Sequence, residues 1–314
     1  MKNIDVLVVG ELNVDIILDQ IDGLPEVGKE KIAEELTVTL GSSSAIFASN
    51  LSTLGANVSF LGKIGTDNHA KIVKTSLEER GVKTNHIIET PDHKTGLTIV
   101  MNYDMDRANI TYPGAMNYLV EPEITDNILQ QAKHLHVSSV FMQLALKSDI
   151  VNLFKRAKAI GLTTSLDPQW DPSEKWELDL EVLLPLVDVF LPNAKEFQFI
   201  TKTNSILSGL EKVKNFANII AIKDGEHGAH LWKNQKMTSK SAFFNPKVAD
   251  CIGAGDSFDA GFISKYINGE NLSECLIFGN IAGAINTTKS GGTTAFESLE
   301  KFKSVAKEQF YINL

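Results

Sequence analysis

The sequence of 314 residues predicts an α/β fold with a doubly wound, mostly parallel sheet and a small β-sheet lid. Short apolar runs rich in branched residues recur along the chain, as expected for strands buried on both faces. Stretches with helical spacing of apolar residues separate many of them, and this alternation is typical of a sheet with right-handed crossovers. Strands are expected at 6–9, 58–61, 135–140, 162–166, 187–191 and 219–222.

The helices expected between these strands include 70–80, 149–160 and 196–202. Two segments interrupt the alternation, at about 15–40 and 95–112, and the second reads as a hairpin whose two strands flank polar residues at 104–107. The hairpin is interpreted either as a lid over a ligand crevice or as a structural flap or dimer contact. Residues 1–314 are expected to form a single domain, because the chain contains no long linker or internal repeat.

Charge and cysteine content exclude several classes of protein. The chain has 30 Lys plus Arg and 39 Asp plus Glu, a net charge of −9, which leaves no basic surface for nucleic acid or an anionic membrane. Its two cysteines, Cys251 and Cys275, can form neither a disulfide framework nor a zinc site. A reducing, cytoplasmic location fits this composition best, and the first apolar run is too short to span a membrane.

Segment 250–262 carries the sharpest functional signal. It reads Asp-Cys-Ile-Gly-Ala-Gly-Asp-Ser-Phe-Asp-Ala-Gly-Phe, with helical spacing of apolar residues after Asp256. Gly253, Ala254 and Gly255 are therefore expected to form a turn before a helix, where free amides and the helix dipole bind an anion. Asp256 would lie in the first helical turn, where a carboxylate can accept a proton from an attacking hydroxyl. An acidic residue that only stabilises the helix start is the alternative interpretation.

This segment closely resembles the C-terminal signature of the PfkB carbohydrate kinases, the ribokinase-like family. Other segments match the family in the same order: 10–15, 41–55, 62–67, 81–82, 95–96, 193–196 and 223–229. The resemblance extends from about Ile4 to about Thr294, nearly the whole chain. It implies the ribokinase-like version of the predicted fold, with lid segments at about 15–40 and 95–112.

The resemblance also implies an ATP-dependent kinase that transfers the γ-phosphate to a hydroxyl, preferably a primary alcohol of a small neutral sugar or polyol. Asp256 would be the general base, and the amides of 253–255 would hold the γ-phosphate. Asn193 and Glu196 would order Mg²⁺, Glu196 through water, because Mg²⁺ prefers oxygen ligands and keeps several waters. Taken alone, the same pair predicts a capping box at a helix start.

The remaining positions implied by the resemblance form three groups. Lys223, Gly225, Gly228 and Asn280 would line the nucleotide, the last near the adenine. Asn13, Asp15, Gly41, Ser42 and Ile46 would bind the sugar. Arg107 is not assigned by the resemblance: at the hairpin turn it would either reach the substrate or a product phosphate or be an exposed turn residue. Asp250, Ile252 and Gly291 would build a site for a monovalent cation such as K⁺. The family also includes dimers formed through the lid, and an exposed hairpin edge gives a physical motive for a homodimer.

The chain departs from the family at several positions. Ser42 replaces a glycine, and Ile46 replaces an Asn that commonly contacts sugar hydroxyls, which disfavours ribose in its usual pose. Gln169 and Asp171 stand where Asn and Arg are frequent, and losing that cation disfavours an acidic sugar. Cys251 replaces a Thr and is expected to be a small, buried packing residue.

Two alternatives to a sugar kinase remain open. The first is a nucleoside kinase of the same fold, in which Ile46, Phe47 and Met116 would form an apolar wall for a base. The second is a catalytically silent regulator that binds nucleotide or sugar. Asp256, together with the 193–196 pair, argues against the silent protein, which needs no base and metal groups.

Overall fold

The computed structural model describes residues 2–103 and 106–314, and its main sheet has eight strands in the order β14-β13-β12-β11-β10-β9-β1-β4. Strands β1, β4 and β9 to β12 are parallel to one another, and β13 and β14 continue the sheet as antiparallel strands at one edge. The bounds are β1 (Ile4–Val9), β4 (Val58–Leu61), β9 (Ala132–Ser138), β10 (Thr163–Asp167), β11 (Val189–Phe190), β12 (Ile219–Lys223), β13 (Ala229–Lys233) and β14 (Lys236–Lys240). The predicted α/β fold with a mostly parallel sheet is confirmed.

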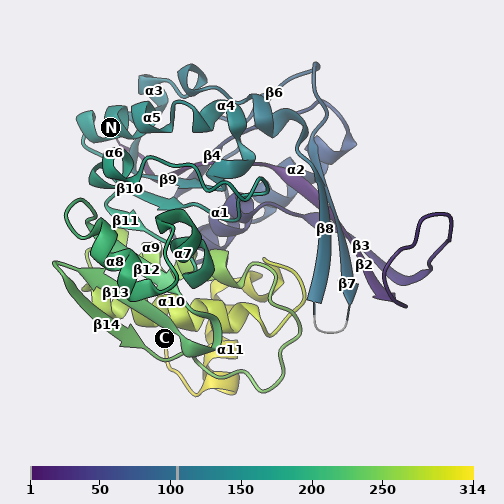
Figure 1. Cartoon of the computed structure of the whole chain (residues 1–314). Helices are drawn as coiled ribbons and strands as arrows, with labels where there is room; N and C mark the ends of the chain where they lie inside the picture. Colours follow the sequence, from purple (N-terminus) through teal and green to yellow (C-terminus); the bar gives the residue numbers. More distant parts are fainter. Residues whose placement is uncertain (1, 104–105) are drawn as a thin grey trace.

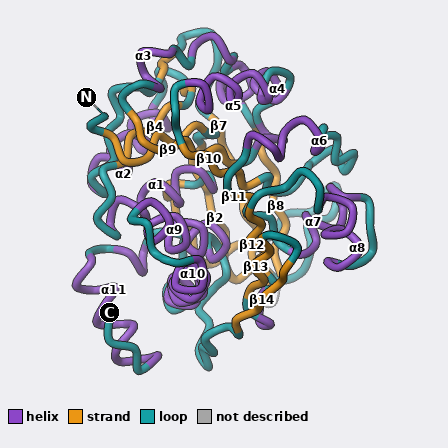
Figure 2. The backbone as a smooth tube through the Cα atoms, turned by 90° about the vertical axis from the view of Figure 1, so that its left-hand side faces the viewer, coloured by secondary structure: helices purple, strands orange, loops and turns teal. Residues whose placement is uncertain are grey.

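Helices cover both faces of the main sheet. One face carries α1 (Ser43–Thr53), α2 (Asn68–Glu79), α9 (Ala254–Ile267) and α10 (Leu272–Asn286), against which α11 (Leu299–Phe310) packs. The other carries α3 (Asp126–Leu129), α4 (Leu144–Lys147), α5 (Ile150–Ala159), α6 (Leu180–Leu183), α7 (Ala194–Thr201) and α8 (Ile206–Val213). Figure 2 shows α9 and α10 on one side of the strands and α7 and α8 on the other. The 3₁₀ helices are η1 (Gly114–Tyr118), η2 (Glu121–Glu123), η3 (Val140–Met142), η4 (Leu184–Leu186), η5 (Gly225–His227) and η6 (Thr294–Phe296).

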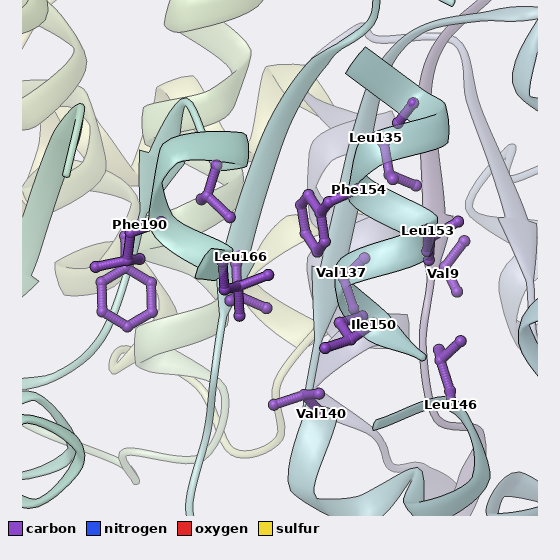
Figure 3. Packing of buried hydrophobic residues seen from close by; sticks show 14 of the residues in the cluster. Val9, Leu135, Val137, Val140, Leu146, Ile150, Leu153, Phe154, Leu166 and Phe190 are labelled. Carbon is purple, nitrogen blue, oxygen red and sulfur yellow. The ribbon is translucent and has the colours of Figure 1, made fainter. Parts of the chain in front are cut away.

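Buried hydrophobic side chains form a cluster on each face of the main sheet, and the side chains of β1 contribute alternately to the two clusters. Leu7 and Val9 belong to the cluster under α5, and Val6 and Val8 belong to the cluster under α1 and α9. Successive side chains of a strand point to opposite faces, so a strand covered on both sides is apolar throughout. Figure 3 shows Val9 of β1 with side chains of β9 and α5 in the first cluster.

A second, four-stranded sheet in the order β3-β2-β7-β8 projects from the main body (Figure 1). It is formed by β2 (Asn13–Ile21), β3 (Ala33–Leu40), β7 (Gly96–Tyr103) and β8 (Asp106–Tyr112), so the segments 15–40 and 95–112 lie in one sheet. A further pair, β5 (Lys63–Ile64) and β6 (Ile88–Glu89), forms a two-stranded sheet. Within the predicted turn 104–107, residues 104 and 105 lie outside the described part. Arg107 is not in a turn but in β8, paired with Asn102.

The strand predicted at 135–140 ends earlier than expected. Ser139 has a left-handed backbone with φ 55°, which ends β9 at Ser138 and turns the chain into η3. The chain passes from β1 to β4 on one side and returns to β9 on the other side of β1. Ligands of open α/β sheets bind at the carboxyl ends of strands where the order reverses in this way.

Candidate functional site

A cavity of about 1040 Å³ opens at the carboxyl ends of the strands, between the main sheet and the small sheet. It is lined by Glu11 after β1, Ser139 after β9 and Gln169 after β10, and thus lies at the reversal point. The small sheet contributes Asn13, Asp15, Thr98, Val100, Arg107, Asn109 and Thr111. The volume of the cavity lies at the upper end of the range for small-molecule sites, which leaves room for two reactants.

Polar groups from the small sheet line one end of the cavity. The Asn13 amide donates to Asp15 Oδ1 at 2.8 Å and to Thr98 Oγ1 at 2.9 Å. Burial raises the pKa of Asp15 to about 6, although the Asn13 amide and the charge of Arg107 lower it. Gly41 does not line the cavity, but a Cβ there would lie 2.1 Å from Asp15 Oδ1, so its missing side chain makes room for this carboxylate.

Ser42 and Ile46 lie at the start of α1. The Ser42 hydroxyl accepts from the Ala45 amide at 3.0 Å and donates to the Glu11 carbonyl at 2.6 Å, so it caps the helix. Ser42 has φ 72°, a backbone conformation that favours glycine. Ile46 lines the cavity and packs against Gly292, beside the turn before α9.

The glycine segment at the start of α9 is open to the cavity at Gly253 and Gly255. The helix begins at Ala254, earlier than expected, so of the predicted turn 253–255 only Gly253 precedes it and Gly255 lies in the first helical turn. Gly253 has φ 74°, and a Cβ there would lie 2.6 Å from Gly292 Cα, so both its conformation and its surroundings require glycine. The N-cap of α9 is Gly253, which has no side chain to cap the helix, and first-turn amides lack acceptors within their helix. Ala254 does not line the cavity, and its N–H donates to the Cys251 carbonyl at 3.3 Å. The turn therefore suits an anion at Gly253 and Gly255.

Asp256 follows this turn and lines the cavity, although only 6% of it is exposed. The Gln169 amide donates to its Oδ1 at 2.8 Å. Burial raises the pKa of Asp256 to about 7; the charges of Asp167 and Glu11 act in the same direction, while Lys223 opposes them. A carboxylate with this pKa is balanced between accepting and releasing a proton near neutral pH.

A buried ionic cluster lies beneath the turn. Lys223 Nζ lies 3.0 Å from Asp167 Oδ2 and 2.9 Å from Asp259 Oδ2. Burial lowers the pKa of Lys223, but the two carboxylates outweigh it and hold the lysine protonated. Burial also raises the pKa of Asp259 well above its usual range. The cluster places a fixed positive charge beside Gly255, at the floor of the cavity.

Asn193 and Glu196 form the capping box of α7 and also line the cavity. The Asn193 side chain accepts from the Glu196 amide at 2.9 Å, and Glu196 Oε2 accepts from the Asn193 amide at 2.8 Å. The interpretation as a capping box and the interpretation as a magnesium-ordering pair therefore concern the same side chains. Burial, and then the charge of Asp167, raise the pKa of Glu196 to about 7.

Magnesium fits this end of the cavity as an ion held largely by water and phosphate. In residues 2–103 and 106–314, no group of three or more His, Cys, Asp or Glu side chains is arranged to hold a metal ion. Glu196 supplies a carboxylate that faces the cavity, and Mg²⁺ commonly binds with one or two carboxylates and substrate phosphates.

The other predicted residues are placed less uniformly. Gly225, Ile252 and Lys223 line the cavity, whereas Gly228, Asn280, Asp250 and Gly291 do not. The Asn280 amide donates to the carbonyls of Lys240 and Ser241 at 3.1 and 3.2 Å. Asp250 accepts from the amides of Ile252 and Gly291, both at 2.8 Å, so the three positions of the predicted cation site lie together.

The burial predicted for Cys251 is wrong. Cys251 is exposed and lines the cavity, because it precedes the glycine turn at the open edge of α9 instead of packing beneath it. Phe47, expected in an apolar wall, is buried against His136, with ring centroids 3.7 Å apart, and does not line the cavity. Ile46 and Met116 do line it.

Sequence reasoning missed the bridging side chains of the site. Asp259 lies three residues after Asp256, on the same helix face, and a second acid on a buried helix needs a counter-charge. That signal could have identified the pairing with Lys223. Nothing in the sequence points to Glu11, which is buried, accepts from the Ser44 hydroxyl and lines the cavity.

Comparison with known proteins identifies the family. The model of the pfkB family carbohydrate kinases matches residues 3–299. The chain belongs to the PfkB family. It is 28% identical to a ribokinase of Staphylococcus aureus, over 96% of this chain and 99% of that one.

Solved structures described as ribokinases share the fold. An Arabidopsis thaliana ribokinase complexed with ribose and ATP superimposes with a TM-score of 0.83 at 23% identity, covering 96% of this chain and 98% of the other. An Escherichia coli structure described as a putative ribokinase II, with ATP and Mg²⁺, gives a TM-score of 0.83 at 21% identity, covering 97% and 99%. Within the described part of this PfkB protein, no helix is both long and apolar enough to cross a membrane.

Proposed function

We propose that the protein is an ATP-dependent kinase that phosphorylates a hydroxyl, preferably a primary alcohol, of a small neutral sugar or polyol. The buried carboxylate of Asp256, at the helix start that follows the open glycine turn, is the observation that carries the proposal. A base and an anion site within one helical turn of each other match what phosphoryl transfer requires.

In the proposed reaction, the acceptor oxygen bonds to the γ-phosphorus while the bond from that phosphorus to the β-phosphate oxygen breaks and ADP leaves. Asp256 takes the proton of the acceptor hydroxyl. The amides of Gly253 and Gly255, with the charge of Lys223 beneath them, stabilise the negative charge on the transferred group. Glu196 would hold Mg²⁺ through water, together with the phosphates, and the bound ion would supply charge neutralisation for the leaving group.

The acceptor is assigned to the end of the cavity formed by the small sheet. Asn13 and Asp15 present an amide and a carboxylate there, groups that donate to and accept from vicinal hydroxyls. Lys223, Gly225 and the turn at 253–255 lie at the other end and are assigned to the nucleotide. Asn280, whose amide is already engaged by Lys240 and Ser241, is a positioning residue in this assignment. Closure of the small sheet would exclude water, which otherwise competes as the nucleophile.

The monovalent-cation site is part of the proposal. Asp250 draws the backbone of Ile252 and Gly291 together beside the anion turn, and carbonyl and carboxylate oxygens suit K⁺. Replacing KCl by tetramethylammonium chloride in the assay tests whether turnover depends on this ion.

We also propose that a second copy of the chain packs on the outer face of the small sheet. Leu36, Val38, Ile110 and Tyr112 are exposed there, and Ile16 and Ile99 connect Val38 to Ile110 across the strands. Residues on the opposite face of β8 line the cavity, so the apolar face points away from it.

The cytoplasmic location inferred from the composition stays a prediction; both cysteines are free.

The first experiment is ADP release with ATP and Mg²⁺ against neutral sugars, polyols, acidic sugars and nucleosides, with Asp256→Asn as the control. Turnover on a neutral sugar that the substitution abolishes supports the proposal. Turnover on a nucleoside favours the alternative, for which Ile46 and Met116 supply apolar walls. ATP binding without turnover on any acceptor favours the other alternative, a catalytically silent regulator.

A further inference from the structure

The side chain of Gln169 connects Asp256 to the end of β10. Its Nε2 lies 2.8 Å from Asp256 Oδ1 and 2.6 Å from Asp167 Oδ2, with the two aspartates on different elements. Carboxylate oxygens only accept hydrogen bonds when ionised, so the nitrogen of the amide must face both of them. One donor group therefore lies between two acids that would otherwise repel each other.

Gln169 is also anchored through its contact with Asp167. Asp167 is 1% exposed and accepts from Lys223 Nζ at 3.0 Å, and Lys223 is in turn paired with Asp259. The backbone of Gln169 has φ 58°, a left-handed conformation that costs free energy in a residue other than glycine. A strained turn anchored on a buried carboxylate fixes the direction of the amide, so the side chain is not free to swing away from Asp256.

Charged groups surround Asp256 from every neighbouring element. Asp167 at the end of β10, Glu11 after β1 and Glu196 on α7 are acidic, and Lys223 at the end of β12 carries positive charge. Asp259 follows on α9 itself. The hydroxyl of Ser43 on α1 also bonds to the carboxylate. Among these groups, Gln169 is neutral, donates directly to Asp256 and is fixed to a second buried acid.

We propose that Gln169 is a positioning residue for phosphoryl transfer: it fixes the rotamer of Asp256 and stabilises its ionised form, so that the other lone pairs of the carboxylate face the acceptor hydroxyl. This rests on the proposed function, because it concerns the same base. A hydrogen bond to the charged form of an acid favours that form. Without the amide, the base keeps its proton up to higher pH and samples other rotamers.

The test compares Gln169→Leu, which removes the donor at similar size, with Gln169→Glu, which replaces it by a third carboxylate. The pH profile of kcat on the acceptor found by the panel is the readout. The acid limb is expected to move to higher pH in the Leu variant and further in the Glu variant. Near pH 6, turnover in the Leu variant should fall about three- to tenfold, with recovery at alkaline pH and little change in the KM for ATP. Gln130→Leu, at an exposed position on the C-cap of α3, is the matched control and should keep the wild-type profile.

An unchanged acid limb in both variants would overturn the proposal, as would an equal loss at every pH. Higher activity in the Leu variant would also overturn it, because Gln169 would then obstruct the site. A second readout keeps the inference separate from the kinase assignment. The pH dependence of the unfolding midpoint should differ between wild type and Gln169→Leu, and this difference should vanish when both carry Asp256→Asn. If that thermal effect is present but no acceptor is turned over, the proposed function fails while the pairing stands.

Discussion

The ammonium group of Lys223 lies 2.9 Å from the carboxylate of Asp259, beneath the glycine turn that precedes Asp256. Together with Asp167, it forms a charged group inside the protein, where only about a tenth of the lysine side chain is exposed. Removing one member of a buried pair leaves an uncompensated charge and costs far more than removing a surface pair.

Lys223→Met is therefore expected to lower the free energy of unfolding by about 3–5 kcal/mol, because Asp167 and Asp259 lose their counter-charge. Chemical unfolding measures the loss. Lys214→Met is the control: Lys214 pairs with Glu211 on the surface, where such pairs contribute about 0–1 kcal/mol. Equal losses in the two variants would contradict a stabilising role for the cluster.

Asp256→Asn is expected to abolish transfer and to stabilise the protein at alkaline pH. The pKa of Asp256 is about 7 in the folded protein, against a model-peptide value near 3.8, so the folded state binds the proton more tightly. Stability is therefore highest below pH 4 as far as this group is concerned, and is lost as the pH rises through about 7. The amide removes this loss, and at pH 8 the variant should be more stable by roughly 2–4 kcal/mol. A less stable variant at pH 8 would contradict the burial argument.

Gly253→Ala is expected to abolish phosphoryl transfer and to cost about 1–3 kcal/mol of stability, since it adds both strain and a clash with Gly292. Gly269→Ala separates these effects. Gly269 also has a left-handed backbone, φ 79°, but a Cβ there meets nothing within 4 Å. Thermal unfolding followed by circular dichroism and ADP release are measured on both variants. If only Gly269→Ala keeps its activity, the loss of activity in Gly253→Ala is due to the glycine turn and not to backbone strain in general.

Asp15→Ala is expected to raise the KM for the acceptor at least tenfold, because a partly buried carboxylate no longer pairs with the hydroxyls of the acceptor. The affinity for ATP, measured by calorimetry without acceptor, should stay unchanged. Asp19→Ala, on the same strand but outside the cavity lining, should affect neither quantity. A weaker affinity for ATP in Asp15→Ala would contradict the assignment of the acceptor end.

Ile110→Asp is expected to convert a dimer into a monomer, because a charge on the outer face of the small sheet opposes burial of that face. Light scattering after size exclusion gives the mass. Leu207→Asp alters a similarly exposed leucine on α8, far along the chain from this sheet, and should leave the mass unchanged. A monomeric wild-type protein at micromolar concentration would contradict the proposed homodimer.

Much of the fold follows from periodicity alone. The run at 58–61 and the helical spacing within 149–160 match β4 and α5, because strands buried on both faces and amphipathic helices leave clear patterns. The end of β9 was wrong because Ser139 adopts a left-handed conformation, which its residue type does not signal.

The residues around Asp256 were predictable only in part. The glycine turn and the capping box of α7 each lie within a few consecutive residues, so local sequence indicates them. The bond from Gln169 to Asp256 joins positions 87 residues apart, and Lys223 pairs with an aspartate 56 residues away. Such partners depend on how β10, β12 and α9 meet in space, and no local pattern encodes that meeting.

The small sheet joins the main body directly: β2 begins at Asn13, after β1 has ended at Val9, and carries Asp15 with it. On the proposed assignment, the acceptor touches both sheets, whereas the nucleotide touches only the main one. ATP alone then makes no contact with the small sheet and does not draw the two sheets together. The site would therefore close only when the acceptor is bound, and ATP would be protected from hydrolysis by water in its absence.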